Sequence, residues 1–166
     1  MKTDPTDVLK EALLLEKRGY AFYKMVSGHI QDKATRRFFE LMADEEQNHI
    51  QLLAEELKMY QSRKKFTRNN FDDTTNTQIA DLILSNPLQE RISAAEFEAA
   101  AISAAMLMEE RAIKLYADRA GASTDTDEKR LYNWLADWER SHLKYLAGID
   151  QALKEKIWND NQFWPF

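Results

Sequence analysis

The chain has 166 residues, a formal net charge of −5, four glycines, three prolines and no cysteine. This length suits a single domain, the scarcity of turn-forming residues favours a few long helices, and the acidic balance argues against nucleic-acid and anionic-membrane partners. Without cysteine the chain can hold no disulfide, iron–sulfur cluster or thiolate metal site, so any metal must bind oxygen and imidazole ligands.

Apolar residues recur at helical spacing in two segments of the first half of the chain. The first predicted helix begins near residues 3–5, where a capping residue and an early proline suit a helix start, and ends at Gly28 as a C-terminal cap. The second predicted helix runs from about Asp32 to near Lys65. Together they form a helix hairpin with a short turn.

The second half of the chain repeats this pattern after a long connection. Residues 61–92 are the predicted crossover, rich in asparagine, with one short helix around the apolar stretch 79–84. Two more predicted helices run from a capping box at Ser93 and Glu96 to Gly121, and from residues 124–127 to beyond Lys154. These elements predict an all-α, antiparallel four-helix bundle of two hairpins, joined between the second and third helices.

The predicted bundle spans residues 1–157, with one hairpin in about 3–60 and the other in about 93–156. The aromatic tail, residues 158–166, has no helical stripe and is expected to dock over the bundle or against a second subunit. The N-terminus lacks an apolar signal region, and the longest apolar stretch is too short to span a bilayer. A cytoplasmic protein is therefore expected.

The two predicted hairpins are copies of one unit, offset by 93 residues. The segment EKRGYAFY, residues 16–23, aligns with EERAIKLY, residues 109–116. Between residues 15–53 and 108–146, 11 of the 39 aligned positions are identical, whereas ordinary composition would give roughly two or three. Coincidence is a poor explanation, and a symmetric bundle can place equivalent residues around a central axis.

Six charged or titratable residues interrupt the otherwise apolar faces of the four predicted helices. They are Glu16, Glu46, His49, Glu109, Glu139 and His142. One Glu-x-x-His pair in a helix is a weak signal, but two pairs at matched positions, each preceded at a matched distance by a core-facing glutamate, indicate a metal site. One glutamate from each of two helices and a Glu-x-x-His from each of the other two is the dinuclear arrangement of ferritin-like bundles.

Burying four carboxylates in one core is costly unless other charges compensate them. Two divalent cations balance the four negative charges, and two neutral imidazoles complete the ligand set. Oxygen and nitrogen ligands favour iron or manganese, with zinc also possible.

The sequence also predicts where two tyrosines and the remaining histidine lie relative to the metal site. Tyr23 and Tyr116 follow the two lone glutamates by seven residues and therefore face the same level of the core. We expect each ring to pack there with its hydroxyl bonded to a ligand carboxylate, in preference to direct redox participation. His29 lies off the repeat and is expected to be a surface loop residue.

The segments EKRGYAFY and EEQNH, with EERAIKLY and ERSH, resemble the ferritin-like superfamily and look most like its rubrerythrin-type branch. The resemblance covers about residues 5–156. It implies that Glu46 and Glu139 bridge two irons, while Glu16 with His49 and Glu109 with His142 complete the separate ions.

The chain also departs from that pattern. Rubrerythrins carry a rubredoxin module with four cysteines, an additional glutamate where this chain has Ala112, and a glutamate where it has His142. Gln47 stands where bacterioferritins have a haem-ligating methionine, so no haem is expected. Many dinuclear iron proteins place an aspartate, bonded to a ligand histidine, where this chain has Glu45 and Trp138. Glu45 could serve that purpose, but Trp138 could not accept the hydrogen bond.

The resemblance implies an oxidoreductase whose two irons reduce hydrogen peroxide or dioxygen. Because the rubredoxin module is missing, the electrons must come from an external donor, and a homodimer is expected. Two alternatives stay open. One is a ferroxidase for iron storage or detoxification in a larger assembly, and the other is a structural bundle that the metal only stabilises.

Overall fold

The computed structural model describes residues 4–69, 71, 77–85, 87–93 and 96–160. Over these residues it contains six helices and no strand, which confirms the predicted all-α class. The helices are α1 (Pro5–His29), α2 (Lys33–Arg63), α3 (Thr77–Ser85), α4 (Leu88–Arg91), α5 (Phe97–Ala122) and α6 (Thr126–Trp158).

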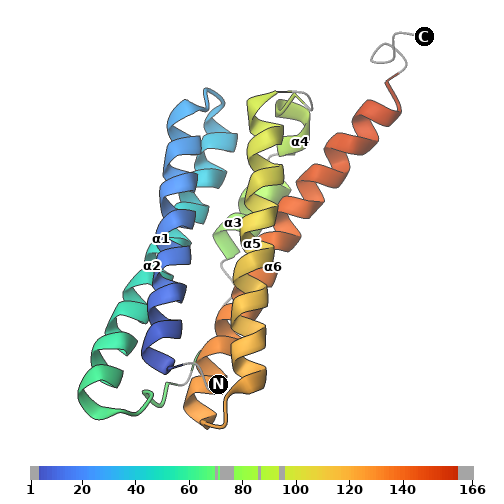
Figure 1. Ribbon diagram of the computed structural model, residues 1–166. Helices are drawn as coiled ribbons and strands as arrows, with labels where there is room; N and C mark the ends of the chain where they lie inside the picture. The colour runs from blue at the N-terminus through green and yellow to red at the C-terminus, as the bar shows by residue number, and fades with distance from the viewer. Residues whose placement is uncertain (1–3, 70, 72–76, 86, 94–95, 161–166) are drawn as a thin grey trace.

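The four long helices form two hairpins that lie side by side, α1 with α2 and α5 with α6 (Figure 1). Equivalent aspartates start the second helix of each hairpin. Asp32 accepts a hydrogen bond of 2.8 Å from the backbone N–H of Thr35, and Asp125 accepts one of 3.0 Å from that of Glu128. These caps satisfy backbone donors that have no partner within the helix, so both short turns form where the repeat places them.

Several predicted helix ends differ from the structure. Gly28 lies inside α1, whose C-cap is Ile30, and none of the four glycines, all among the described residues, has a positive φ. The capping box predicted at Ser93 is wrong, because α5 begins at Phe97 with an extended Glu96 as its N-cap and no side-chain cap bond. The helix therefore begins about one turn later than predicted.

The described part of the crossover contains two short helices, α3 and α4, where the sequence predicted one. Their buried residues Ile79 and Leu88, with Ile92 beyond, join an apolar core of the bundle. Helix α3 packs on α2, and α4 packs on α6 and α2. The crossover therefore covers the side of the bundle formed by α2 and α6, and no such covering packs on the α1–α5 side among the described residues.

Two apolar cores fill the bundle, one towards each end. The first includes Phe39 and Ile102, and the second includes Leu9 and Leu135. The predicted metal ligands lie on all four long helices between these cores. Burial of the apolar side chains on both sides keeps water from the ends of this polar layer.

Trp158, the first residue of the predicted tail, is the last residue of α6 and is 77% exposed. The predicted docking of this tail falls mostly on residues 161–166, which lie outside the described residues. Within the part of the chain that the structure describes, no helix is both long and apolar enough to cross a membrane.

Candidate metal centre

The structure brings all six predicted ligands together in the middle of the bundle. Each is at most 4% exposed. They form two overlapping groups whose ligand atoms lie within 4.8 Å of one another. The groups are Glu16, Glu46, His49 and Glu139, and Glu46, Glu109, Glu139 and His142. Glu46 and Glu139 belong to both groups, which is the position the family resemblance implies for bridging carboxylates.

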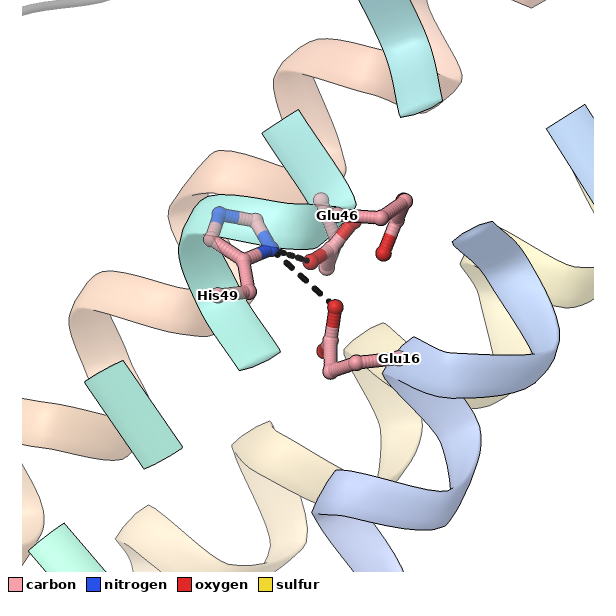
Figure 2. A group of neighbouring side chains, drawn as sticks. Glu16, Glu46 and His49 are labelled. Carbon is pink, nitrogen blue, oxygen red and sulfur yellow. Dashed lines mark hydrogen bonds and ion pairs between the residues drawn. The ribbon is translucent and has the colours of Figure 1, made fainter. Parts of the chain in front are cut away.

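His49 directs one ring nitrogen at carboxylates from two other helices. Its Nδ1 lies 2.9 Å from Oε1 of Glu139 and 3.2 Å from Oε2 of Glu16. Figure 2 shows Glu16 on α1 pointing towards Glu46 and His49 on α2, with a dashed line joining His49 to Glu16. Residues from opposite hairpins therefore meet at this nitrogen.

His142 takes the equivalent place in the second half. Its Nδ1 lies 3.0 Å from Oε2 of Glu139, 3.6 Å from Oε1 of Glu46 and 3.7 Å from Oε1 of Glu109. The two imidazole rings stack at 6.0 Å between centroids. The carboxylate of Glu139 lies between them and presents one oxygen to each ring.

Two tyrosine hydroxyls bind the outer glutamates, Glu16 and Glu109, which each belong to one ligand group, as the sequence predicted. Tyr23 of α1 donates a hydrogen bond to Glu109 of α5, and Tyr116 of α5 donates one to Glu16 of α1. Burial and the adjacent carboxylate, Glu109 for Tyr23 and Glu16 for Tyr116, raise both tyrosine pKa values well above the usual range. Both hydroxyls therefore stay protonated and fix the carboxylates that accept from them.

The pKa values of the buried glutamates and of His49 show that the cluster needs positive charge. Burial, followed by repulsion from Glu139, raises the pKa of Glu109 to about 8 and that of Glu46 well above its usual range. Burial lowers the pKa of His49, but attraction to Glu139 and Glu16 outweighs it and raises the pKa to about 10. Without a cation the cluster must hold protons to limit its negative charge.

The residues present fit two divalent cations. Four carboxylates and two imidazoles converge in a closed layer, and two ions of charge +2 would replace the protons and leave the layer neutral. Each group offers three oxygen ligands and one nitrogen ligand, a set that suits iron or manganese and also admits zinc.

The histidine side of the cluster is closed by aromatic rings. The ring of His49 meets Trp134 and Trp138 edge to face at 5.7 and 5.8 Å, and Trp134 stacks on Phe71 at 4.9 Å. The outward Nε2 atoms of His49 and His142 are buried and have no hydrogen-bond partner among the described residues. Trp138 packs edge to face on His49, and Glu45, which the sequence analysis put forward as an acceptor, forms no hydrogen bond with either Nε2 atom.

The side of the cluster that faces α1 and α5 is open, a feature that the sequence analysis missed. A cavity of about 330 Å³ lies against α1 and α5 and reaches Glu46 and Glu139, but neither histidine lines it. Gly19 leaves room for Glu46 here, because a Cβ at this position would approach Cδ and Oε2 of Glu46 to 3.2 Å. The signal was available in the repeat, since Gly19 and Ala112 are small residues three positions after equivalent glutamates.

His29 lies away from this cluster, as predicted. It is the exposed last residue of α1, and its Nδ1 lies 2.8 Å from the backbone oxygen of Met25. It belongs to a helix end, however, and not to a loop.

A helical bundle with repeated hairpins and a buried carboxylate–histidine cluster defines a protein of the ferritin-like class. Comparison with protein families gives a match to the rubrerythrin family over residues 7–149, so the chain belongs to the rubrerythrin family. This family implies iron binding at such a cluster. Neither the search of curated proteins nor that of solved structures found a match.

Proposed function

We propose that this protein is a dinuclear iron oxidoreductase that reduces hydrogen peroxide or dioxygen with electrons from an external donor. The observation that carries the proposal is the sharing of Glu46 and Glu139 by two ligand groups that are otherwise separate. Two irons held in this way would supply two electrons to one substrate by passing between the ferrous and ferric states.

The residues of the chain have separate tasks in this proposal. Glu16 and His49 complete one position, and Glu109 and His142 complete the other. The hydroxyls of Tyr23 and Tyr116 keep the outer carboxylates in place.

The surroundings of the cluster support the same function. The apolar cores and the aromatic rings beside His49 exclude water from three directions. The cavity on the α1–α5 side leaves the fourth direction open for a substrate to reach Glu46 and Glu139.

Anaerobic loading with ferrous iron, followed by addition of hydrogen peroxide, tests the proposal. We expect two irons per chain, oxidised stoichiometrically and faster than free iron, and metal analysis of the purified protein distinguishes iron from manganese and zinc. Glu109→Ala should lose this rapid oxidation. Glu110→Ala is the matched control, because Glu110 is the next residue of α5 and its side chain is exposed.

Two outcomes would favour the alternatives. A closed cage of many chains that fills with ferric mineral would indicate storage, and size-exclusion chromatography detects it. A protein whose melting temperature alone changes on chelation would have a structural metal. Two bound irons that oxidise no faster than free iron contradict the proposed reaction.

A further inference from the structure

The cavity beside the cluster is much larger than hydrogen peroxide requires. Its volume is about 330 Å³, whereas one water occupies about 30 Å³ of liquid. A cavity of this size holds about ten non-hydrogen atoms at that density and lies at the lower end of the range for organic ligands in proteins. A substrate with a carbon chain therefore fits it better than peroxide alone.

The lining of the cavity changes from its floor to its mouth. All four glutamates of the cluster line it, and Glu46 and Glu139 are the two that both ligand groups share. Its walls include the apolar side chains of Leu15, Phe22 and Met108. An occupant thus needs a polar reactive end near the glutamates and an apolar segment along the walls.

Two arginines complete the lining. Arg18 of α1 and Arg111 of α5 are exposed and occupy equivalent positions of the repeat. Neither forms an ion pair within the described ranges of the chain. Guanidinium groups bind carboxylates through paired, charge-assisted hydrogen bonds, so the mouth of the cavity suits an anionic head group.

We propose that the cavity binds an organic hydroperoxide with an anionic head group, of the medium-chain acyl type. The carboxylate lies at the exposed Arg18 and Arg111, outside the enclosed volume. The chain lies along Leu15 and Met108, and the hydroperoxide group points towards the cluster, so that about ten non-hydrogen atoms lie inside the cavity. This assignment names the substrate class of the proposed peroxide reduction and rests on that function.

The reaction balances without a further co-reactant. The O–O bond of the hydroperoxide breaks, the external donor of the proposed function supplies two electrons, and solvent supplies two protons. The products are the corresponding alcohol and one water.

Binding is tested first in zinc-loaded protein, which cannot turn over. Isothermal titration with decanoate should give one site per chain. The double variant Arg18→Gln/Arg111→Gln should weaken decanoate binding by about tenfold or more, since hydrogen bonds to a charged group are each worth about 1.5–3 kcal/mol. It should leave the binding of decanol nearly unchanged.

Matched controls come from the repeat and from the neighbouring residue. Arg37→Gln/Arg130→Gln removes another equivalent pair of exposed arginines outside the cavity and should not affect decanoate. Met108→Trp should fill the cavity and abolish binding, whereas Leu107→Trp adds the same bulk at a residue that is 58% exposed and does not line the cavity. Thermal melts show that each variant folds.

Turnover by iron-loaded protein is the second measurement. The ratio of kcat/KM for 10-hydroperoxydecanoate to that for hydrogen peroxide should fall about tenfold in the Arg18→Gln/Arg111→Gln variant. The ratio should stay unchanged in Arg37→Gln/Arg130→Gln.

The possible failures are distinguishable. If iron-loaded protein reduces no peroxide while zinc-loaded protein binds decanoate through the arginines, the proposed reaction fails and the binding site stands. If hydrogen peroxide is reduced but decanoate does not bind, or binds independently of Arg18 and Arg111, the substrate class is wrong. If decanoate binds only to monomer obtained by dissociating a dimer, a second copy covers the mouth and the assignment is also wrong.

Discussion

Tyr116 donates a hydrogen bond to Glu16 across the boundary between the two hairpins, 100 residues away in sequence. The equivalent bond from Tyr23 to Glu109 runs in the opposite direction. Each hairpin therefore supplies the hydroxyl that orients a carboxylate of the other, and neither outer glutamate is positioned by its own hairpin alone.

Removing one of these hydroxyls should weaken metal binding. Tyr116→Phe leaves Glu16 without its donor and should lower metal affinity by about 10- to 100-fold, the usual effect of losing a partner of a ligand. The phenyl ring still fills the core. The melting temperature of the metal-loaded protein should therefore fall only by the amount that weaker metal binding accounts for. Competition with a chelator measures the affinity, and Tyr60→Phe, which changes a partly exposed tyrosine of α2, is the control. Equal affinities in the two variants would contradict the assigned role.

Shared and unshared glutamates should differ in metal stoichiometry. Glu46→Ala or Glu139→Ala removes a ligand from both groups and should reduce binding from two ions per chain to none at ordinary metal concentrations. Glu16→Ala or Glu109→Ala removes a ligand from one group and should leave one ion. Native mass spectrometry counts the ions directly. Full occupancy in Glu46→Ala would show that this residue is not a bridge.

Gly19 and Gly148 should respond in opposite ways to the same substitution. Gly148→Ala places a Cβ in open space on α6 and should stabilise the protein by about 0.5–1 kcal/mol through helix propensity. Gly19→Ala gains the same propensity but moves Glu46 by a few tenths of an ångström. It should therefore lower metal affinity or peroxide turnover without unfolding the chain. Chemical denaturation measures the effect on stability, and chelator competition measures the effect on metal affinity. A fully active Gly19→Ala variant would show that the close approach of Gly19 to Glu46 does not limit function.

The metal-free protein should lose stability as the pH rises. The pKa of His49 is raised from 6.5 to about 10 in the folded chain, so the stability it contributes is complete below pH 6.5 and is lost by pH 10. The pKa of Glu109 is raised from 4.5 to about 8, which acts in the same direction at lower pH. The melting temperature of metal-free protein should therefore fall between pH 6.5 and 10. Metal-loaded protein should show a flatter profile, because the cations replace the protons. A melting temperature of the metal-free protein that rises over this pH range would contradict the raised pKa values of His49 and Glu109.

The bundle could be predicted because two signals agreed. Helical periodicity located the four long helices, and the repeat showed that they form two similar hairpins. The helix ends were less predictable, since Gly28 and Gly121 resembled C-terminal caps but lie inside helices with ordinary backbone angles. A glycine ends a helix only where the chain needs a positive φ, and here Ile30 and Ser123 end the helices in extended conformation.

The ligand cluster was predictable for the same reason, because each ligand breaks an apolar stripe at a position that the other half repeats. The surroundings of the cluster could not be predicted from the sequence. The cavity lies where Gly19 of α1 approaches Glu46 of α2, and the closed side depends on where Trp134 and Phe71 meet. Such contacts depend on the packing of segments far apart in the chain, which periodicity within one helix does not specify.

The exchange of ligands between hairpins would make any bound metal ion a cross-link between them. Neither hairpin contains a complete group, because Glu139 completes the set around His49 and Glu46 completes the set around His142. A half-length chain with one lone glutamate and one Glu-x-x-His pair could build the same centre only by associating with a second copy. The crossover converts that association into an intramolecular one, so the centre forms at a fixed effective concentration whatever the amount of protein in solution.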